Sequence, residues 1–120
     1  MNALKLAYLG DAYYEYKIRL YLVNQNIERV EKLHKTCVTY TSSVAQSKII
    51  EYFLENKILT ETEDEIYLNG RNQKSKVRKN LNYKDHIRAT GFETLIGSLL
   101  LNDANRCDYL IDLAINFVNS

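Results

Sequence analysis

Apolar residues recur at helical spacing along almost the whole chain, and no proline interrupts them. Within residues 3–23 they form two adjoining stripes, with Leu6, Leu9, Tyr13, Tyr16 and Leu20 on one and Ala7, Tyr14, Ile18, Tyr21 and Leu22 on the other. These stripes predict a long and largely buried first helix. No alternating strand pattern or hairpin turn competes with helix. The sequence therefore predicts an all-α fold.

The sequence predicts five further helices, and capping residues mark the start of three of them. Ser42 or Ser43 is a candidate N-cap, the segment Thr60-Glu61-Thr62-Glu63 is a capping box, and Asp103 is suited to cap the last helix. Residues 74–82 carry no apolar period and are expected to form a loop. The expected helices cover residues 29–40, from Ser42 or Ser43 to about 57, about 61–72, from Tyr83 or Asp85 to Leu101, and 104–118.

Composition indicates one domain spanning residues 1–120. The chain has 120 residues, of which 46% are hydrophobic and 26% charged, which suffices for a single core. No apolar run approaches the roughly 20 residues of a membrane span, and Asp11 and Glu15 interrupt any secretory signal pattern. Cys37 and Cys107 lie far apart with no metal-site spacing, so both are expected to be small buried residues in a reducing cytoplasm.

Positive charge is concentrated in residues 71–88. This segment holds seven basic residues and one acidic residue, for a net charge of +6, whereas the rest of the chain holds nine basic and fourteen acidic residues. A concentrated basic segment on an otherwise acidic chain favours local binding of a polyanion, because each Lys or Arg near a phosphate releases counterions. A solvated loop is the simpler interpretation, and charge alone does not decide between the two.

Two carboxylates lie in apolar surroundings. Asp11 follows Gly10 among apolar and aromatic residues, and Glu93 is the only charged residue between Arg88 and the end of its helix. A buried carboxylate needs a cation or takes up a proton. Gly10 and Gly97 allow two helices to approach closely, which could bring the carboxylates together to hold Mg²⁺. The alternative is structural, with Asp11 paired to a Lys or Arg and Glu93 capping a neighbouring helix.

Four segments together resemble the ribonuclease III family. Residues 6–15 (LAYLGDAYYE) resemble its signature helix, and residues 92–101 (FETLIGSLLL) resemble its second acidic helix. Residues 33–35 (LHK) and 70–75 (GRNQKS) resemble the compact bacterial subgroup called Mini-ribonuclease III. The order and spacing of the four segments match over nearly the whole chain. The resemblance implies the helical bundle of the family's catalytic domain.

The resemblance also implies an activity. It implies a homodimeric, Mg²⁺-dependent endoribonuclease, with Mn²⁺ able to substitute, that cuts double-stranded RNA in the cytoplasm, in bacteria chiefly the 23S ribosomal RNA precursor. A large-subunit ribosomal protein is a further candidate partner, and no membrane is involved. Asp11 matches the metal-binding aspartate and Glu93 the essential glutamate, so both are assigned to catalysis and to the metal. The larger enzymes carry carboxylates where this chain has Ala7 and Thr90, so water and RNA phosphate are expected to supply much of the coordination.

RNA recognition is assigned to this domain, because the chain has no residues left for an appended double-stranded RNA-binding domain. A-form RNA is recognised through its shape, phosphates and 2′-hydroxyls. Tyr8 matches an aromatic residue that inserts into the partner subunit, and it is assigned to the dimer interface. The assigned RNA contacts are Arg71, Asn72, Lys74, Ser75, Lys76, Arg78, Lys79 and Asn80 of the basic segment, with His34 and Lys35 of the LHK segment.

Two other acidic residues and two other classes of function stay open. Glu31 is a candidate further acidic ligand or a solvated charge, and an ion pair with Arg19 is the simpler account of Glu15.

A non-catalytic, dimeric module that binds duplex RNA or associates with the ribosome is the main alternative to an enzyme. A helical protein-interaction module is the other, and it leaves the basic segment without a role.

Overall fold

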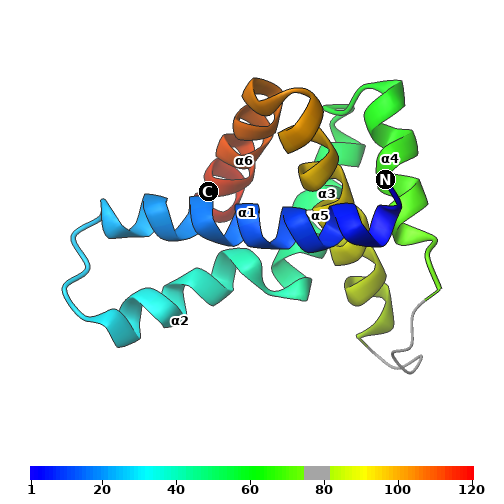
Figure 1. Cartoon of the computed structure of the whole chain (residues 1–120). Helices are drawn as coiled ribbons and strands as arrows, with labels where there is room; N and C mark the ends of the chain where they lie inside the picture. The colour runs from blue at the N-terminus through cyan, green and yellow to red at the C-terminus, as the bar shows by residue number, and fades with distance from the viewer. Residues whose placement is uncertain (75–81) are drawn as a thin grey trace.

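The computed structural model describes residues 1–74 and 82–120, and this part of the chain folds into six helices with no strand (Figure 1). The all-α prediction is confirmed, and the helix bounds lie within about two residues of those expected. The predicted loop at 74–82 falls almost wholly outside the described residues. The helices are α1 (Ala3–Val23), α2 (Val30–Thr41), α3 (Ser43–Glu55), α4 (Glu61–Arg71), α5 (Tyr83–Asn102) and α6 (Ala104–Asn119).

Three helices begin at the caps that the sequence indicates. The Ser42 hydroxyl accepts a hydrogen bond from the backbone N–H of Ala45 at 3.1 Å, and Asp103 accepts one from Arg106 at 3.2 Å. Thr60 and Glu63 form the predicted capping box in both directions, at 3.1 and 2.9 Å. These side chains satisfy backbone donors that the first turn of a helix leaves unpaired, which explains why the helices begin there.

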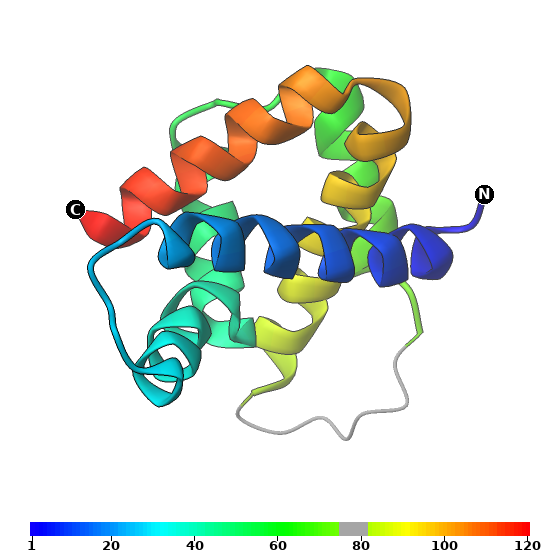
Figure 2. The same ribbon diagram turned by 60° about the vertical axis from the view of Figure 1, so that its left-hand side comes forward.

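Helix α5 is the centre of the fold. It crosses behind α1, and α3 and α4 pack against it (Figures 1 and 2). Every residue from Thr94 to Leu99 is buried, so this part of α5 is covered on all sides. A helix that is apolar all round must be enclosed by its neighbours. Glu93, which directly precedes this run, is half-buried and lies at the edge of the core.

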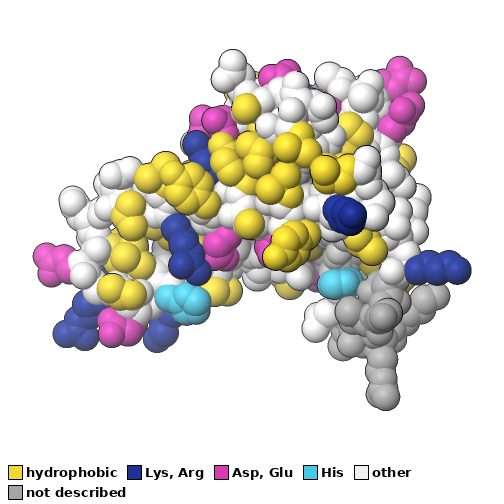
Figure 3. Space-filling model, in the orientation of Figure 1, with side chains coloured by type: hydrophobic (Ala, Val, Ile, Leu, Met, Phe, Trp, Pro, Cys, Tyr) yellow, Lys and Arg dark blue, Asp and Glu magenta, His cyan; other side chains and the backbone are white. Residues whose placement is uncertain are grey.

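One face of α1 is exposed, so the prediction of a largely buried helix is wrong. The side chains at Leu4, Tyr8, Tyr16 and Leu20 are 50%, 84%, 57% and 41% exposed. Helix α5 packs against the opposite face of α1, because a second helix backbone can come close only where the side chains are small. Figure 3 shows hydrophobic side chains gathered along α1 and over α6 on the exposed side. The buried face consists of Ala3, Ala7, Gly10, Tyr14, Ile18 and Leu22.

Helix α6 is attached to the rest of the fold by Arg106. Its guanidinium donates two hydrogen bonds to Glu63 at 2.9 Å and one to the carbonyl oxygen of Ile58 at 2.8 Å. Glu63 is 5% exposed, and the hydrogen bonds from Arg106 hold the pKa of this carboxyl below its usual range despite its burial. The pair thus fixes α6 to the start of α4 and to the connection before it.

Both cysteines are buried and free, as the sequence predicts. Among the described residues, no helix has both the length and the apolar character that crossing a bilayer requires.

Candidate active site

Asp11 and Glu93 lie where α1 and α5 cross. A Cβ added at Gly10 would stand 1.8 Å from the backbone oxygen of Glu93, and one added at Gly97 would stand 2.0 Å from that of Leu6. Only glycine permits such an approach, since real Cβ atoms do not come this close to a backbone oxygen. The two glycines therefore bring α1 against α5 at the level of the acids, and the side chains of Asp11 and Glu93 come within hydrogen-bonding reach of each other.

The environment of Glu93 favours its protonated form. Burial is the main cause and the facing Asp11 carboxylate adds to it, which together raise the pKa of Glu93 to about 9. Gln46 acts in the opposite direction, because its amide donates a hydrogen bond to the carboxylate. Asp11 is exposed. At neutral pH Glu93 therefore keeps its proton unless a cation takes its place.

The structural alternative for these acids is not what the structure shows. Within residues 1–74 and 82–120, no salt bridge joins Asp11 or Glu93 to a basic side chain. Glu93 lies in the interior of α5, and its carboxylate contacts Gln46 and Asp11, not the end of a neighbouring helix. Two carboxyl groups that face each other in this way are costly for folding when both are ionised. Their arrangement suits the binding of a cation.

The donor set fits a hard divalent cation that keeps most of its water. The described residues contain no group of three or more His, Cys, Asp or Glu side chains that could enclose a metal. Mg²⁺ typically binds through one or two carboxylates, with water and substrate phosphate completing its shell. A buried acceptor beside the pair, Gln46 Oε1, has no hydrogen-bond partner in the described chain, which is consistent with an incomplete polar site.

Neither of the other acids joins this pair. Glu15 forms the predicted ion pair with Arg19, with 3.1 Å between Oε2 and Nε, and Cys37 Sγ lies 3.9 Å from the same carboxylate. Glu31 is an exposed residue in the first turn of α2. Thr90 donates its hydroxyl to the carbonyl oxygen of His86 at 3.1 Å, so it serves the helix backbone.

Gln46 is the site residue that inspection of the sequence missed. It is 2% exposed and lies in the first turns of α3. A signal for it exists, because Gln46, Ile49, Ile50 and Phe53 recur at helical spacing and all four are buried. A lone amide on an apolar stripe indicates a polar partner inside the protein, and here the partners are the carbonyl oxygen of Thr41 and the carboxylate of Glu93.

The assigned RNA contacts lie on two separate elements. His34 and Lys35 are exposed on α2, which packs beside α1. Arg71 is half-buried at the end of α4, Asn72 caps that helix, and Lys74 is exposed. Helices α2 and α4 do not touch, so these two groups of residues are not brought together. The remaining assigned contacts, Ser75, Lys76, Arg78, Lys79 and Asn80, lie outside the described residues.

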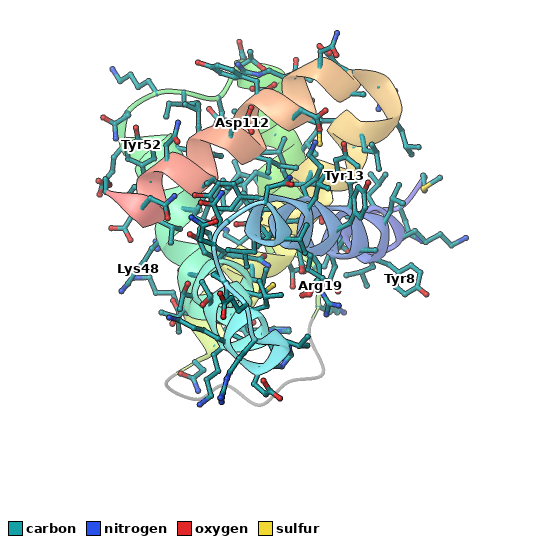
Figure 4. The ribbon with its side chains drawn as sticks, turned by 90° about the vertical axis from the view of Figure 1, so that its left-hand side faces the viewer. Tyr8, Tyr13, Arg19, Lys48, Tyr52 and Asp112 are labelled. Atoms are coloured by element: carbon teal, nitrogen blue, oxygen red, sulfur yellow. The ribbon has the colours of Figure 1, made fainter. Side chains whose placement is uncertain are left out.

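Among the residues that the structure describes, Tyr8 is the most exposed large hydrophobic side chain, at 84%. Figure 4 shows it projecting outward from α1, whereas Tyr13 lies between α1 and α6. The Tyr13 hydroxyl donates a hydrogen bond to Asp108 at 2.6 Å. Tyr13 is thus anchored within the chain, and Tyr8 is free to contact another molecule.

Comparison with known proteins gives the family of this chain. Residues 4–104 match the model of the ribonuclease III domain. The chain is 48% identical to Mini-ribonuclease 3 of Acholeplasma laidlawii over 98% of its length and 94% of the relative, and 44% identical to that of Clostridium tetani over 97% and 78%. A crystal structure of a Fusobacterium nucleatum protein superposes with a TM-score of 0.82 at 26% identity, covering 97% of this chain and 93% of that one. The chain therefore belongs to the ribonuclease III family, within its Mini-ribonuclease 3 group.

Proposed function

We propose that Asp11 and Glu93 are the catalytic, metal-binding acids of a Mg²⁺-dependent endoribonuclease, with Mn²⁺ as an alternative ion. Membership of the ribonuclease III family makes the chain an endoribonuclease of double-stranded RNA. The observation that carries the residue assignment is the crossing of α1 and α5, where glycine contacts hold two carboxylates face to face.

The residues of this chain prepare the site before substrate arrives. Asp11 is exposed to solvent, where RNA phosphate can approach. The Glu93 carboxylate accepts a hydrogen bond from the Gln46 amide. A divalent ion bound to such a pair supplies an activated water and offsets the charge that develops on the phosphodiester. No nucleophilic side chain is needed, and the expected products carry 5′-phosphate and 3′-hydroxyl ends.

Duplex RNA is the substrate class that the charge pattern favours. The +6 segment at 71–88 begins at the end of α4, and α4 packs on α5, the helix that carries Glu93. Basic side chains are the usual contacts of RNA phosphates, so a segment of this charge favours a nucleic-acid substrate. As the natural substrate we propose the 23S ribosomal RNA precursor in the cytoplasm, with a large-subunit ribosomal protein as a candidate partner, both on the family resemblance.

The exposed apolar face of α1 supports a homodimer. Tyr8, Tyr16 and Leu20 form a stripe on this face, and Tyr109 on α6 is 53% exposed (Figure 3). Aromatic and aliphatic side chains exposed together are typical of the core of a protein interface. Two copies joined through this face would carry two sites, which suits cleavage of both strands of a duplex.

The proposal is tested by cleavage of a long RNA duplex in Mg²⁺, with Asp11→Asn as the variant and a chelator control. The substitution keeps the shape of the side chain and removes its charge. We expect the parent to cut and the variant to bind RNA without cutting. A parent that binds duplex RNA and never cuts it would instead support the non-catalytic module, although that function has no use for two facing carboxylates.

A further inference from the structure

Gln46 connects three elements of the fold at the active site. It lies near the start of α3, and the two hydrogens of its amide point to two different helices. Nε2 donates to the carbonyl oxygen of Thr41, the last residue of α2, at 3.0 Å, and to Glu93 Oε2 on α5 at 3.5 Å. The second distance is at the long end of the hydrogen-bond range.

The orientation of this amide is dictated by its neighbours. Thr41 O and Glu93 Oε2 are both acceptors, so turning the amide over would place its oxygen against two other oxygens. The carbonyl of Thr41 belongs to the end of a helix, where backbone oxygens lack partners within the helix. Anchored to this fixed carbonyl, the amide presents one N–H to Glu93 in a single direction.

The same arrangement leaves Gln46 Oε1 without a partner among the described residues, although the side chain is 2% exposed. An unpaired buried acceptor weakens folding. If Gln46 served only to fill space under α5, an apolar side chain of equal size would do so without this cost. The hydrogen bonds to Thr41 and Glu93 are therefore what distinguish the glutamine from an apolar residue at this position, and only the second of them reaches an acid of the site.

We propose that Gln46 is a positioning residue for Glu93. By holding one carboxylate oxygen on the side of α3, it directs the rest of the carboxylate to the side where Asp11 faces it, in the arrangement that binds the divalent ion. This inference rests on the proposed role of the acid pair, and it adds a role for a side chain of α3. Hydrogen-bonding partners that orient metal ligands typically change metal affinity or activity 10–100-fold when removed.

The test uses Gln46→Met, which keeps the length and bulk of the side chain and removes both donors together with the unpaired acceptor. Ser47→Ala is the matched control, because Ser47 is also 2% exposed on α3 and, within the described part of the chain, makes no hydrogen bond to Glu93. Gln46→Leu is a second apolar variant in case the methionine variant does not fold. Melting temperature and circular dichroism establish folding of all three.

Two readouts separate positioning from a structural role. The first is Mg²⁺ binding to the RNA-free protein by calorimetry, and the second is the dependence of cleavage on the concentrations of RNA and Mg²⁺. For Gln46→Met we expect Mg²⁺ affinity and kcat to fall roughly tenfold or more, KM for the duplex to stay unchanged, and the melting temperature to match the parent. Ser47→Ala should match the parent in every readout.

The outcomes also separate this proposal from the one on which it rests. A parent that cuts RNA together with a folded Gln46→Met variant that cuts and binds Mg²⁺ equally well would overturn the role of Gln46 alone. A parent that does not cut RNA would overturn the proposed function. In that case the Mg²⁺ titrations still decide the role of Gln46, because unchanged affinity in the variant contradicts it.

Discussion

At the scale of single residues, the central feature is a carboxyl group kept protonated by its surroundings. Burial and the Asp11 carboxylate raise the pKa of Glu93 to about 9. Such a group weakens the folded state in the absence of a cation and becomes useful when a cation arrives. The cost to stability and the capacity to bind a metal thus have the same origin.

Replacing Glu93 with Gln should stabilise the metal-free protein at alkaline pH. Between roughly pH 4.5 and pH 9 the folded chain keeps a proton that the unfolded chain releases, so the free energy of unfolding falls as pH rises through this window. The Glu93→Gln variant has no such group. We expect it to exceed the parent by at least about 1 kcal/mol at pH 8.5 and to match it at pH 4. Urea denaturation in the presence of a chelator measures the free energy of unfolding of the two proteins. If this free energy depended on pH equally in both, the raised pKa of Glu93 would be contradicted.

At the scale of helices, two glycines set the distance between α1 and α5. The sequence indicated these glycines and the convergence of the acids beside them, because Gly10 precedes Asp11 and Gly97 follows Glu93 by one turn. The structure agrees with this geometry. The helix bounds were also predictable, since Thr60 and Asp103 are strong capping residues.

Other features could not be predicted, for physical reasons. An apolar stripe that packs in the core and one that faces solvent or a partner have the same spacing. The sequence therefore could not tell which of the two stripes of α1 is buried and which, with Tyr16 and Leu20, is exposed. Gln46 is 47 residues from Glu93 along the chain, and only the packing of α3 on α5 brings the two together. The role of a single buried amide depends on such a contact.

Gly10→Ala should separate the two helices. Alanine favours helix over glycine, yet its Cβ would stand 1.8 Å from the Glu93 backbone oxygen. We expect a loss of about 3 kcal/mol or more in the free energy of unfolding, together with a loss of cleavage. Ala12→Gly, on the exposed side of the same helix, should cost only about 1 kcal/mol and serves as the control. Equal losses in the two variants would contradict a tight crossing.

Arg106→Met should loosen α6. The variant leaves the buried Glu63 carboxylate without its cation, at an expected cost of about 3 kcal/mol above pH 6. Because Arg106 depresses the pKa of Glu63, this stabilisation is lost as pH falls, and the difference from the parent should shrink below about pH 4. Arg19→Met, which removes an exposed ion pair, should cost less than about 1 kcal/mol. Thermal unfolding at several pH values checks this, and a difference independent of pH would argue against the Glu63 pair as its source.

At the scale of the whole molecule, the apolar face of α1 and the acid pair belong to the same helix. Tyr8 precedes Asp11 by less than one turn, so an interface on this face would lie next to the active site. In the proposed dimer, helix α1 would carry both an interface residue and a catalytic acid. Such a dimer would place two copies of the acid pair on one duplex, one for each strand.

Tyr8→Asp should convert the proposed dimer to a monomer. The side chain is 84% exposed, so the charge costs the isolated fold little and is unfavourable only when a second copy covers it. Val44→Asp, at a 46% exposed apolar position on α3, is the control and should stay dimeric. Sedimentation velocity at micromolar concentration measures whether each protein is a monomer or a dimer. A monomeric parent, or a Tyr8→Asp protein that remains dimeric, would place the interface elsewhere or nowhere.

The most direct measurement is calorimetric titration of Mg²⁺ into the RNA-free protein at pH 7.5, in two buffers that differ in their heat of ionisation. If the ion displaces the proton held by Glu93, binding should release about one proton per ion, and neither Glu93→Gln nor Asp11→Asn should show this release. Mg²⁺ binding without proton release, or binding that both variants retain in full, would contradict the assignment of this pair as the metal site.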